Sequence, residues 1–183
     1  MELNRRTVGL PNLITLGRLL ATPLAVSMIA SQRHVEAFAT FLIAGVSDGV
    51  DGFIAKRFDM QTELGAYLDP LAHKALLVSI YVTLAIVGAL PPPLAILVVS
   101  RDLMILMAVV VSWLLDKPVA IRPVWASKIN TVAQIALAAL VLGVRAFGVE
   151  ETAGIMFGVW VVAASTIVSG GVYIGQWLKH MSA

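Results

Sequence analysis

Residues 94–115 read LAILVVSRDLMILMAVVVSWLL, a stretch of 22 residues in which the only charged side chains are those of Arg101 and Asp102. About 20 residues of helix cross a hydrocarbon core of roughly 30 Å. A backbone at that depth must pair its own N–H and C=O groups, which a helix does. The stretch therefore predicts a membrane-spanning helix, and further helices of the same kind should surround it.

The composition of the whole chain agrees with this prediction. Of its 183 residues, 59% are apolar and 13% are charged, and the mean hydropathy is +0.90, whereas an average soluble domain has roughly 25% charged residues. Charge-poor stretches predict six helices, over residues 13–30, 35–53, 65–90, 94–115, 128–144 and 152–177. The residues from Pro91 to Pro93 lack N–H donors and predict a loop. The sequence thus predicts an all-α integral membrane protein with six transmembrane helices, forming one domain over residues 1–183.

Basic residues are distributed unevenly between the two ends of the predicted helices. Those on one side are Arg5, Arg6, Lys56, Arg57, Lys117, Arg122 and Lys179, while only Arg33 and Arg145 lie clearly on the other. Because cytoplasmic loops carry an excess of Lys and Arg, both termini are predicted to be cytoplasmic, in the inner membrane of a bacterium. The absence of cysteine excludes disulfides and thiolate metal sites. The sequence also lacks a basic stripe interleaved with aromatic residues, the pattern that would indicate nucleic-acid binding.

Five of the eleven acidic residues lie in one short segment, at Asp48, Asp51, Asp59, Glu63 and Asp69. Residues 47–57 read SDGVDGFIAKR and residues 65–74 read GAYLDPLAHK. Asp48 and Asp51 are three positions apart near the end of the second helix. Asp69 and His73 are four apart near the start of the third, so each pair shares a helix face. If these helices pair antiparallel, three carboxylates and an imidazole converge at the cytoplasmic end of the bundle.

Carboxylates at membrane depth are costly, about +2.5 to 3.5 kcal/mol each on insertion scales, and like charges repel. A cation should therefore lie among them. Short Asp side chains offer hard oxygen ligands that suit Mg²⁺ or Mn²⁺, and these ions also bridge to phosphates. Gly52 and Gly65 flank the acids and would let a large head group approach the backbone. Under the alternative, the Asp residues cap helix ends and pair with Lys56, Arg57 and Lys74, which requires neither the shared face nor the glycines.

The pattern resembles the signature of the CDP-alcohol phosphotransferases, D-x2-D-G-x2-A-R-x8-G-x3-D-x3-D. The chain matches it with every spacing intact at Asp48, Asp51, Gly52, Ala55, Gly65 and Asp69. The resemblance implies a six-helix membrane enzyme, usually a homodimer, whose acidic residues hold a divalent metal against the pyrophosphate of a CDP-linked lipid. A hydroxyl group of a second alcohol then attacks the lipid-side phosphorus, and CMP leaves.

The resemblance also implies roles for single residues. The metal ligands would be Asp48, Asp51, Asp69 and His73, the catalytic residues His73 and Asp69, and the substrate-binding residues Gly52, Ala55, Lys56, Arg57 and Gly65. Two positions depart from the signature. Lys56 stands where the signature has an Arg. A lysine cannot form the two-pronged hydrogen bond of an arginine to a phosphate, unless Arg57 provides that bond instead. His73 replaces the fourth Asp, a metal ligand and base in the family, so a relative of low activity is an alternative prediction.

The acceptor alcohol must be recognised by the other helices. Residues 100–102, SRD, and 127–134, SKINTVAQ, are similar to the mitochondrial-type cardiolipin synthases, which use CDP-diacylglycerol and phosphatidylglycerol. Arg101 and Lys128 are therefore predicted to bind an anionic acceptor, and they would serve glycerol 3-phosphate equally in a phosphatidylglycerophosphate synthase. Each could instead reach the membrane interface or pair with Asp102 or Asp116. The predicted partners are CDP-diacylglycerol, one of these acceptors, membrane lipids and a second copy of the chain.

Two further features leave alternatives open. Intramembrane carboxylates also mark ion pathways in transporters, but those proteins tend to have broken helices in paired halves, which this sequence does not display. Gly154 and Gly158, like Gly171 and Gly175, are four positions apart in the last helix and permit close helix contact, either within one protomer or between two.

Overall fold

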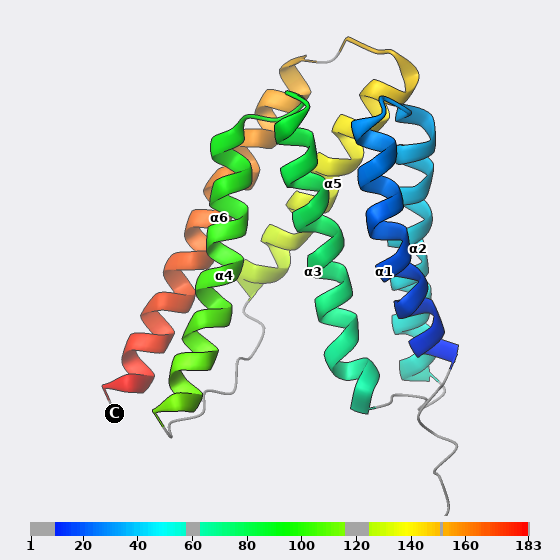
Figure 1. Cartoon of the computed structure of the whole chain (residues 1–183). Coiled ribbons are helices and arrows are strands. Elements are labelled where there is room, and N and C mark those ends of the chain that lie inside the picture. Colours follow the sequence, from blue (N-terminus) through cyan, green and yellow to red (C-terminus); the bar gives the residue numbers. More distant parts are fainter. Residues whose placement is uncertain (1–9, 58–62, 116–124, 151, 183) are drawn as a thin grey trace, which may run out of the picture.

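The computed structural model describes the backbone of residues 10–57, 63–115, 125–150 and 152–182, and the side chains of residues 15–47, 71–115, 125–150 and 152–182. Within these ranges the chain forms six α-helices and no strand, as the sequence predicts (Figure 1). They are α1 (Leu10–Ala30), α2 (His34–Arg57), α3 (Glu63–Ile86), α4 (Pro92–Leu114), α5 (Trp125–Phe147) and α6 (Thr152–Met181).

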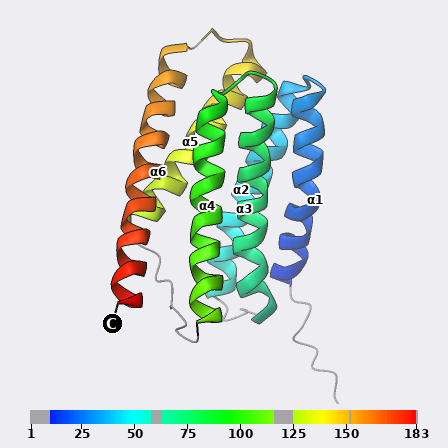
Figure 2. The same ribbon diagram turned by 60° about the vertical axis from the view of Figure 1, so that its left-hand side comes forward.

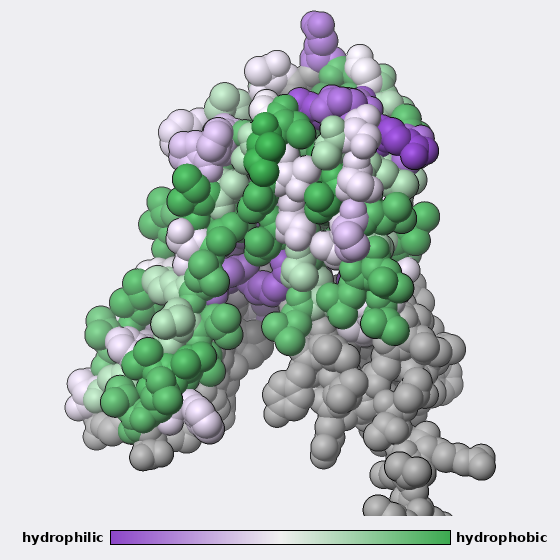
Figure 3. Space-filling model, in the orientation of Figure 1, coloured by the Kyte–Doolittle hydropathy of each residue, from purple (hydrophilic) through white to green (hydrophobic). Residues whose placement is uncertain are grey.

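Three of the helices, α4, α5 and α6, are long and apolar enough over their described residues to cross a membrane. The other three contribute shorter apolar runs, Thr15–Ala30, His34–Ser47 and Leu71–Ile86. Large hydrophobic side chains cover the outside of the bundle, among them Phe157 and Trp160 on α6, which are 72% and 69% exposed (Figure 3). The prediction of an all-helical membrane protein is therefore confirmed, whereas three spans, not six, are established by these described residues.

The prediction for the connection between the third and fourth helices needs a correction. α3 ends at Ile86 instead of residue 90, because Gly88 has a φ of 71°, a left-handed conformation that glycine adopts without strain. Only Pro91 stands outside the next helix, with an extended backbone, and Pro92 already begins α4. The first turn of a helix has no intrahelical partners for its N–H groups, so prolines are tolerated there.

Three short connections lie together at one end of the bundle, which we call the turn end (Figure 1). They follow α1, α3 and α5, and the described residues of each include one with positive φ, Gln32, Gly88 and Gly148 respectively. At the first of them an exposed ion pair joins Arg33 to Glu36, at 2.9 Å. The start of α1 and the end of α6 both lie at the opposite end (Figure 1).

In the view of Figure 1 the helices separate into two groups toward the opposite end, α1 with α2 and α3, and α4 with α6. Figure 2 shows the same bundle turned by 60°. α5 crosses the bundle diagonally and packs against α6 and α2. It therefore joins the two groups where α3 and α4 diverge.

Among the residues whose side chains are described, much of the apolar core lies in the half of the bundle near the turn end. Its fully buried side chains include Ile80, Tyr81 and Leu84 of α3, Val98 of α4 and Leu142 of α5. Close packing also occurs between α5 and α6.

A methyl group added at Gly158 would lie 2.8 Å from Leu137 Cδ1. At least this part of the small-residue stripe of α6 thus serves contact within one protomer.

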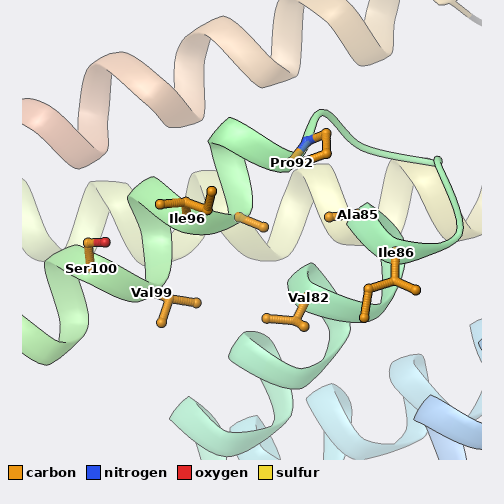
Figure 4. A pocket seen from close by; sticks show the side chains of 8 residues that line it. Val82, Ala85, Ile86, Pro92, Ile96, Val99 and Ser100 are labelled. Carbon is orange, nitrogen blue, oxygen red and sulfur yellow. The ribbon is translucent and has the colours of Figure 1, made fainter.

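On the outside of this half, α3 and α4 border an apolar groove. Val82 and Ile86 line it from α3, and Pro92, Ile96 and Ser100 line it from α4 (Figure 4). Its lining has no charged side chain, so it is not a place for phosphate chemistry. The charged side chains of the core lie farther along the same two helices.

Candidate active site

Both signature runs are helical, as their spacing requires. Asp48, Asp51 and the residues to Arg57 belong to α2, and Gly65 and Asp69 belong to α3. The predicted side chains that lie outside the described residues are those of Asp48, Asp51, Gly52, Ala55, Lys56, Arg57, Gly65 and Asp69. Their roles remain predictions.

Direct pairing of α2 with α3, on which the predicted convergence of the signature residues depends, is not the main contact of these helices over the described residues. Over the described residues, α3 packs chiefly on α1 and α4, while α2 packs on α1 and α5. α1 therefore lies against both helices that carry the signature. The sequence suggested an antiparallel pair because a short connection joins neighbours in most bundles.

His73 is a half-buried residue of α3, one position before Lys74. Among the residues whose side chains are described, no three His, Cys, Asp or Glu side chains gather closely enough to hold a metal ion. A metal centre at His73 thus requires the carboxylates of the signature. These would be suitable ligands, because carboxylate oxygens from two helices, with one imidazole, form a donor set that a hard divalent cation accepts.

Arg101 of α4 lies at the centre of the buried polar groups. Its side chain is only 4% exposed. Nη1 donates to Asp102 Oδ1 at 2.8 Å, and Nη2 donates to Ser127 Oγ of α5 and Ser169 Oγ of α6, at 2.8 and 2.5 Å. The guanidinium carbon also lies 5.3 Å from the ring centre of Tyr173. One residue therefore connects three helices. The pairing of Arg101 with Asp102, which the sequence left as the alternative to acceptor binding, is present in the structure.

The same carboxylate oxygen of Asp102 reaches across to α3. Lys74 Nζ donates to it at 2.5 Å, and the two side chains are 42% and 12% exposed. Figure 3 shows hydrophilic surface on this face, partway along the bundle. We call Lys74, Arg101 and Asp102 the charge cluster. The sequence did not predict the ion pair of Lys74 with Asp102, because the two residues are 28 positions apart. Only the packing of α3 on α4 brings them together.

Lys128, the other predicted acceptor-binding residue, is placed differently from Arg101. It is exposed at the start of α5, and its ammonium lies 5.0 Å from the ring centre of Trp125. A cation over an aromatic face is a weak attraction at an exposed position. Lys128 therefore keeps donors available, whereas most of those of Arg101 are occupied.

Deeper in the bundle, a row of polar groups joins α5 to α6. Asn130 Oδ1 accepts from Ser165 Oγ and Thr166 Oγ1, both at 2.9 Å. Its own Nδ2, like Arg101 Nε and Gln134 Nε2, is buried and has no hydrogen-bond partner among the described residues. Toward the opposite end, Trp177 Nε1 of α6 donates to Ser112 Oγ of α4 at 2.8 Å. Polar contacts thus join α6 to both α5 and α4.

Comparison with known proteins identifies the family to which the signature and the charge cluster belong. Residues 8–169 match the CDP-alcohol phosphatidyltransferase family. The chain belongs to that family. The matched region contains both signature runs and the whole charge cluster, so the resemblance in the sequence is confirmed.

The relatives of this phosphatidyltransferase chain include two kinds of enzyme. It is 35% identical to the chloroplastic CDP-diacylglycerol–glycerol-3-phosphate 3-phosphatidyltransferase 1 of Oryza sativa, over 96% of the chain and 58% of the relative. It is 33% identical to a cardiolipin synthase/mitochondrial hydrolase fusion protein of Schizosaccharomyces pombe, over 90% and 30%. It is 30% identical to the cardiolipin synthase of Rattus norvegicus, over 78% and 53%.

The chain spans no more than 58% of the length of these three relatives. The family and its relatives support a transferase of phospholipid biosynthesis on an integral membrane chain. They do not distinguish phosphatidylglycerol from glycerol 3-phosphate as acceptor. The predicted location in a bacterial inner membrane is also not established, because the rice relative is a chloroplast protein.

Proposed function

We propose that this chain transfers the phosphatidyl group of CDP-diacylglycerol to phosphatidylglycerol, giving cardiolipin and CMP. The observation that carries the proposal is the family match over residues 8–169, which encloses the acidic signature and the charge cluster. Cardiolipin synthases among the relatives support the choice of acceptor.

In the proposed reaction, the hydroxyl oxygen of the acceptor forms a bond to the lipid-side phosphorus of CDP-diacylglycerol, and the bond from that phosphorus to the CMP oxygen breaks. The hydroxyl proton must leave at the same time. His73 is the proposed base, because a neutral imidazole nitrogen accepts a proton. Asp69, one helical turn earlier in α3, is the second catalytic residue and could accept the same proton.

Asp48, Asp51, Asp69 and His73 would hold Mg²⁺ or Mn²⁺, and the bound ion would neutralise charge on the phosphate oxygens during transfer. Gly52, Ala55 and Gly65 would leave room for the head group, with Lys56 and Arg57 beside the phosphates. Lys128 and Arg101 would attract the anionic acceptor.

Glycerol 3-phosphate is the second candidate acceptor, with phosphatidylglycerophosphate as product. It is favoured by the rice relative, which aligns with 96% of the chain and is named for that acceptor. Both acceptors present a glycerol hydroxyl group and a phosphate, so the same charge cluster suits either. The third candidate is a relative of low activity, because His73 stands where the signature has an Asp.

The proposal includes six membrane spans in one domain, cytoplasmic termini and a homodimer. Reporter fusions at Lys117 and after Ala183 should report a cytoplasmic position, and a fusion at Pro92 an external one. A cytoplasmic Pro92 would invert this topology. Chemical crosslinking in native membranes should give a dimer and no larger species.

The deciding assay measures CMP release by the full chain in lipid nanodiscs containing CDP-diacylglycerol. Either phosphatidylglycerol or glycerol 3-phosphate is supplied, with and without Mg²⁺. We expect metal-dependent CMP release with phosphatidylglycerol. Release only with glycerol 3-phosphate selects the second candidate, and no release with either acceptor contradicts transferase activity in this chain.

Variants of the signature test the site. Asp48→Ala, Asp51→Ala and Asp69→Ala should each abolish metal-dependent release, because the remaining carboxylates hold too little charge to bind Mg²⁺. The matched control is Glu150→Ala, which removes an exposed carboxylate at the turn end and should leave the rate unchanged. Near-normal activity in any of the three Asp variants, at equal expression, removes that residue from the site.

A further inference from the structure

The charge cluster carries one positive charge more than its own carboxylate balances. Asp102 Oδ1 accepts hydrogen bonds from both Lys74 Nζ and Arg101 Nη1, at 2.5 and 2.8 Å. One negative charge thus faces two positive ones. A structural ion pair between α3 and α4 would need only one of the two cations.

The surplus charge is presented by Lys74. The side chain of Arg101 is 4% exposed, and its guanidinium is surrounded by four side chains, those of Asp102, Ser127, Ser169 and Tyr173. The Lys74 side chain is 42% exposed. Asp102 is its only hydrogen-bond partner among the described residues, and an ammonium group has three N–H donors.

Lys74 is also next to the predicted chemistry. It follows His73 directly in α3, and its bond to α4 joins two helices that diverge toward the end opposite the turn end (Figure 1). An ammonium group binds phosphate as a point charge and does not demand one ligand geometry. The ligand that fits a half-exposed, surplus ammonium at this place is a phosphate oxygen.

We propose that Lys74 binds a phosphate oxygen of a substrate, with Asp102 as the positioning residue that holds its ammonium between α3 and α4 beforehand. The inference rests on the proposed function and adds a specificity-determining residue outside the signature. Two substrates could supply the oxygen, the CDP-linked lipid through its pyrophosphate or the acceptor through its phosphate. If the ion pair were only structural, removing the Lys74 charge would leave the binding of both substrates unchanged.

The test measures equilibrium binding by the full chain in nanodiscs, in two arms. One arm supplies the acceptor, either as phosphatidylglycerol in the disc or as soluble glycerol 3-phosphate, and the other varies the content of CDP-diacylglycerol in the disc. We expect Lys74→Met to weaken binding at least tenfold in one arm, which identifies the substrate whose phosphate it contacts. Lys74→Arg should stay within about threefold of the wild type because it keeps the charge.

Salt dependence separates a binding role from a structural one. Wild-type binding should weaken as salt rises, and the slope should be shallower in Lys74→Met, since screening acts on the lost charge. Lys179→Met, which removes an exposed ammonium at the end of α6, is the matched control and should keep the wild-type affinity and slope. Should Lys74→Met fail to fold, Lys74→Gln, which keeps a donor for Asp102 without the charge, replaces it.

Unchanged affinity and slope of Lys74→Met in both arms, with a wild type that binds, overturns the role of Lys74 and leaves the proposed function standing. A wild type that binds in neither arm and releases no CMP overturns both.

Discussion

Near the turn end the helices meet through aliphatic and aromatic side chains, such as Ile80, Leu84 and Leu142. In the other half they meet through Arg101, Asn130, Ser169 and the ion pair from Lys74 to Asp102. Six of the ten buried polar residues of the described chain, Arg101, Ser112, Asn130, Gln134, Thr166 and Ser169, lie on α4, α5 and α6. Lipid tails are as apolar as leucine, so the first half is held by close packing and the second by hydrogen bonds.

The difference between the halves shows where this fold tolerates buried polar groups that lower its stability. A buried guanidinium and unpartnered amide donors are unfavourable in an apolar surrounding. The core side chains Ile80, Leu84 and Leu142 carry none of them. The polar half keeps them beside the signature helices, which is the pattern expected where ligand binding outweighs stability.

The largest effect should come from His73→Asp, which restores the fourth acid of the signature. A carboxylate is a better ligand for Mg²⁺ than an imidazole and adds one negative charge. We expect CMP release to rise by orders of magnitude, with a smaller change in CDP-diacylglycerol affinity, since the gain lies mainly in the transition state. His34→Asp, the same exchange at the turn end, should change nothing. A rapid wild type that His73→Asp leaves unchanged would mean that another group takes the proton.

Arg101→Met should be the next largest change, because it removes the residue that joins α4, α5 and α6. Asp102 would keep only Lys74, and Ser127 and Ser169 would each lose a partner. Breaking such a buried pair costs about 3–5 kcal/mol, and CMP release should fall at least a hundredfold per folded molecule. Thermal unfolding and the CMP assay measure the two losses. A stable, fully active Arg101→Met variant would show that the polar contacts of Arg101 are not needed for CMP release.

Leu84→Ala tests the other half of the comparison. Leu84 is fully buried, and truncating such a leucine destabilises by about 2–5 kcal/mol. The rate of CMP release per folded molecule should stay at the wild-type value. Denaturation in mixed micelles gives the stability, and activity is normalised to the folded fraction. A loss of activity beyond the unfolded fraction would show that the two halves are coupled.

Gly158→Ala should have the smallest effect. The added methyl group would lie 2.8 Å from Leu137 Cδ1, so the leucine must move, at a cost of about 1 kcal/mol in a packed interface. Gly171→Ala is the matched control, since nothing lies within 4 Å of its added methyl group. Only the first should lower the unfolding temperature. Equal behaviour of the two would mean that α5 and α6 have room to adjust.

Much of the fold follows from the sequence alone. Hydropathy and spacing predicted all six helices, because length and apolarity are properties of contiguous residues. The helical runs that carry Asp48, Asp51 and Asp69 followed from the same local patterns. The end of α3 did not, because Gly88 changes the backbone direction and prolines at the start of α4 are compatible with a helix.

The site needed the tertiary structure. Arg101 and Lys128 had equal standing in the sequence, yet one is buried between three helices and the other exposed on Trp125. Lys74 had no distinction until α3 and α4 placed it against Asp102. Local patterns determine which residues are helical, but burial and charge balance depend on residues far apart in the chain. Only the packing of helices decides those partners.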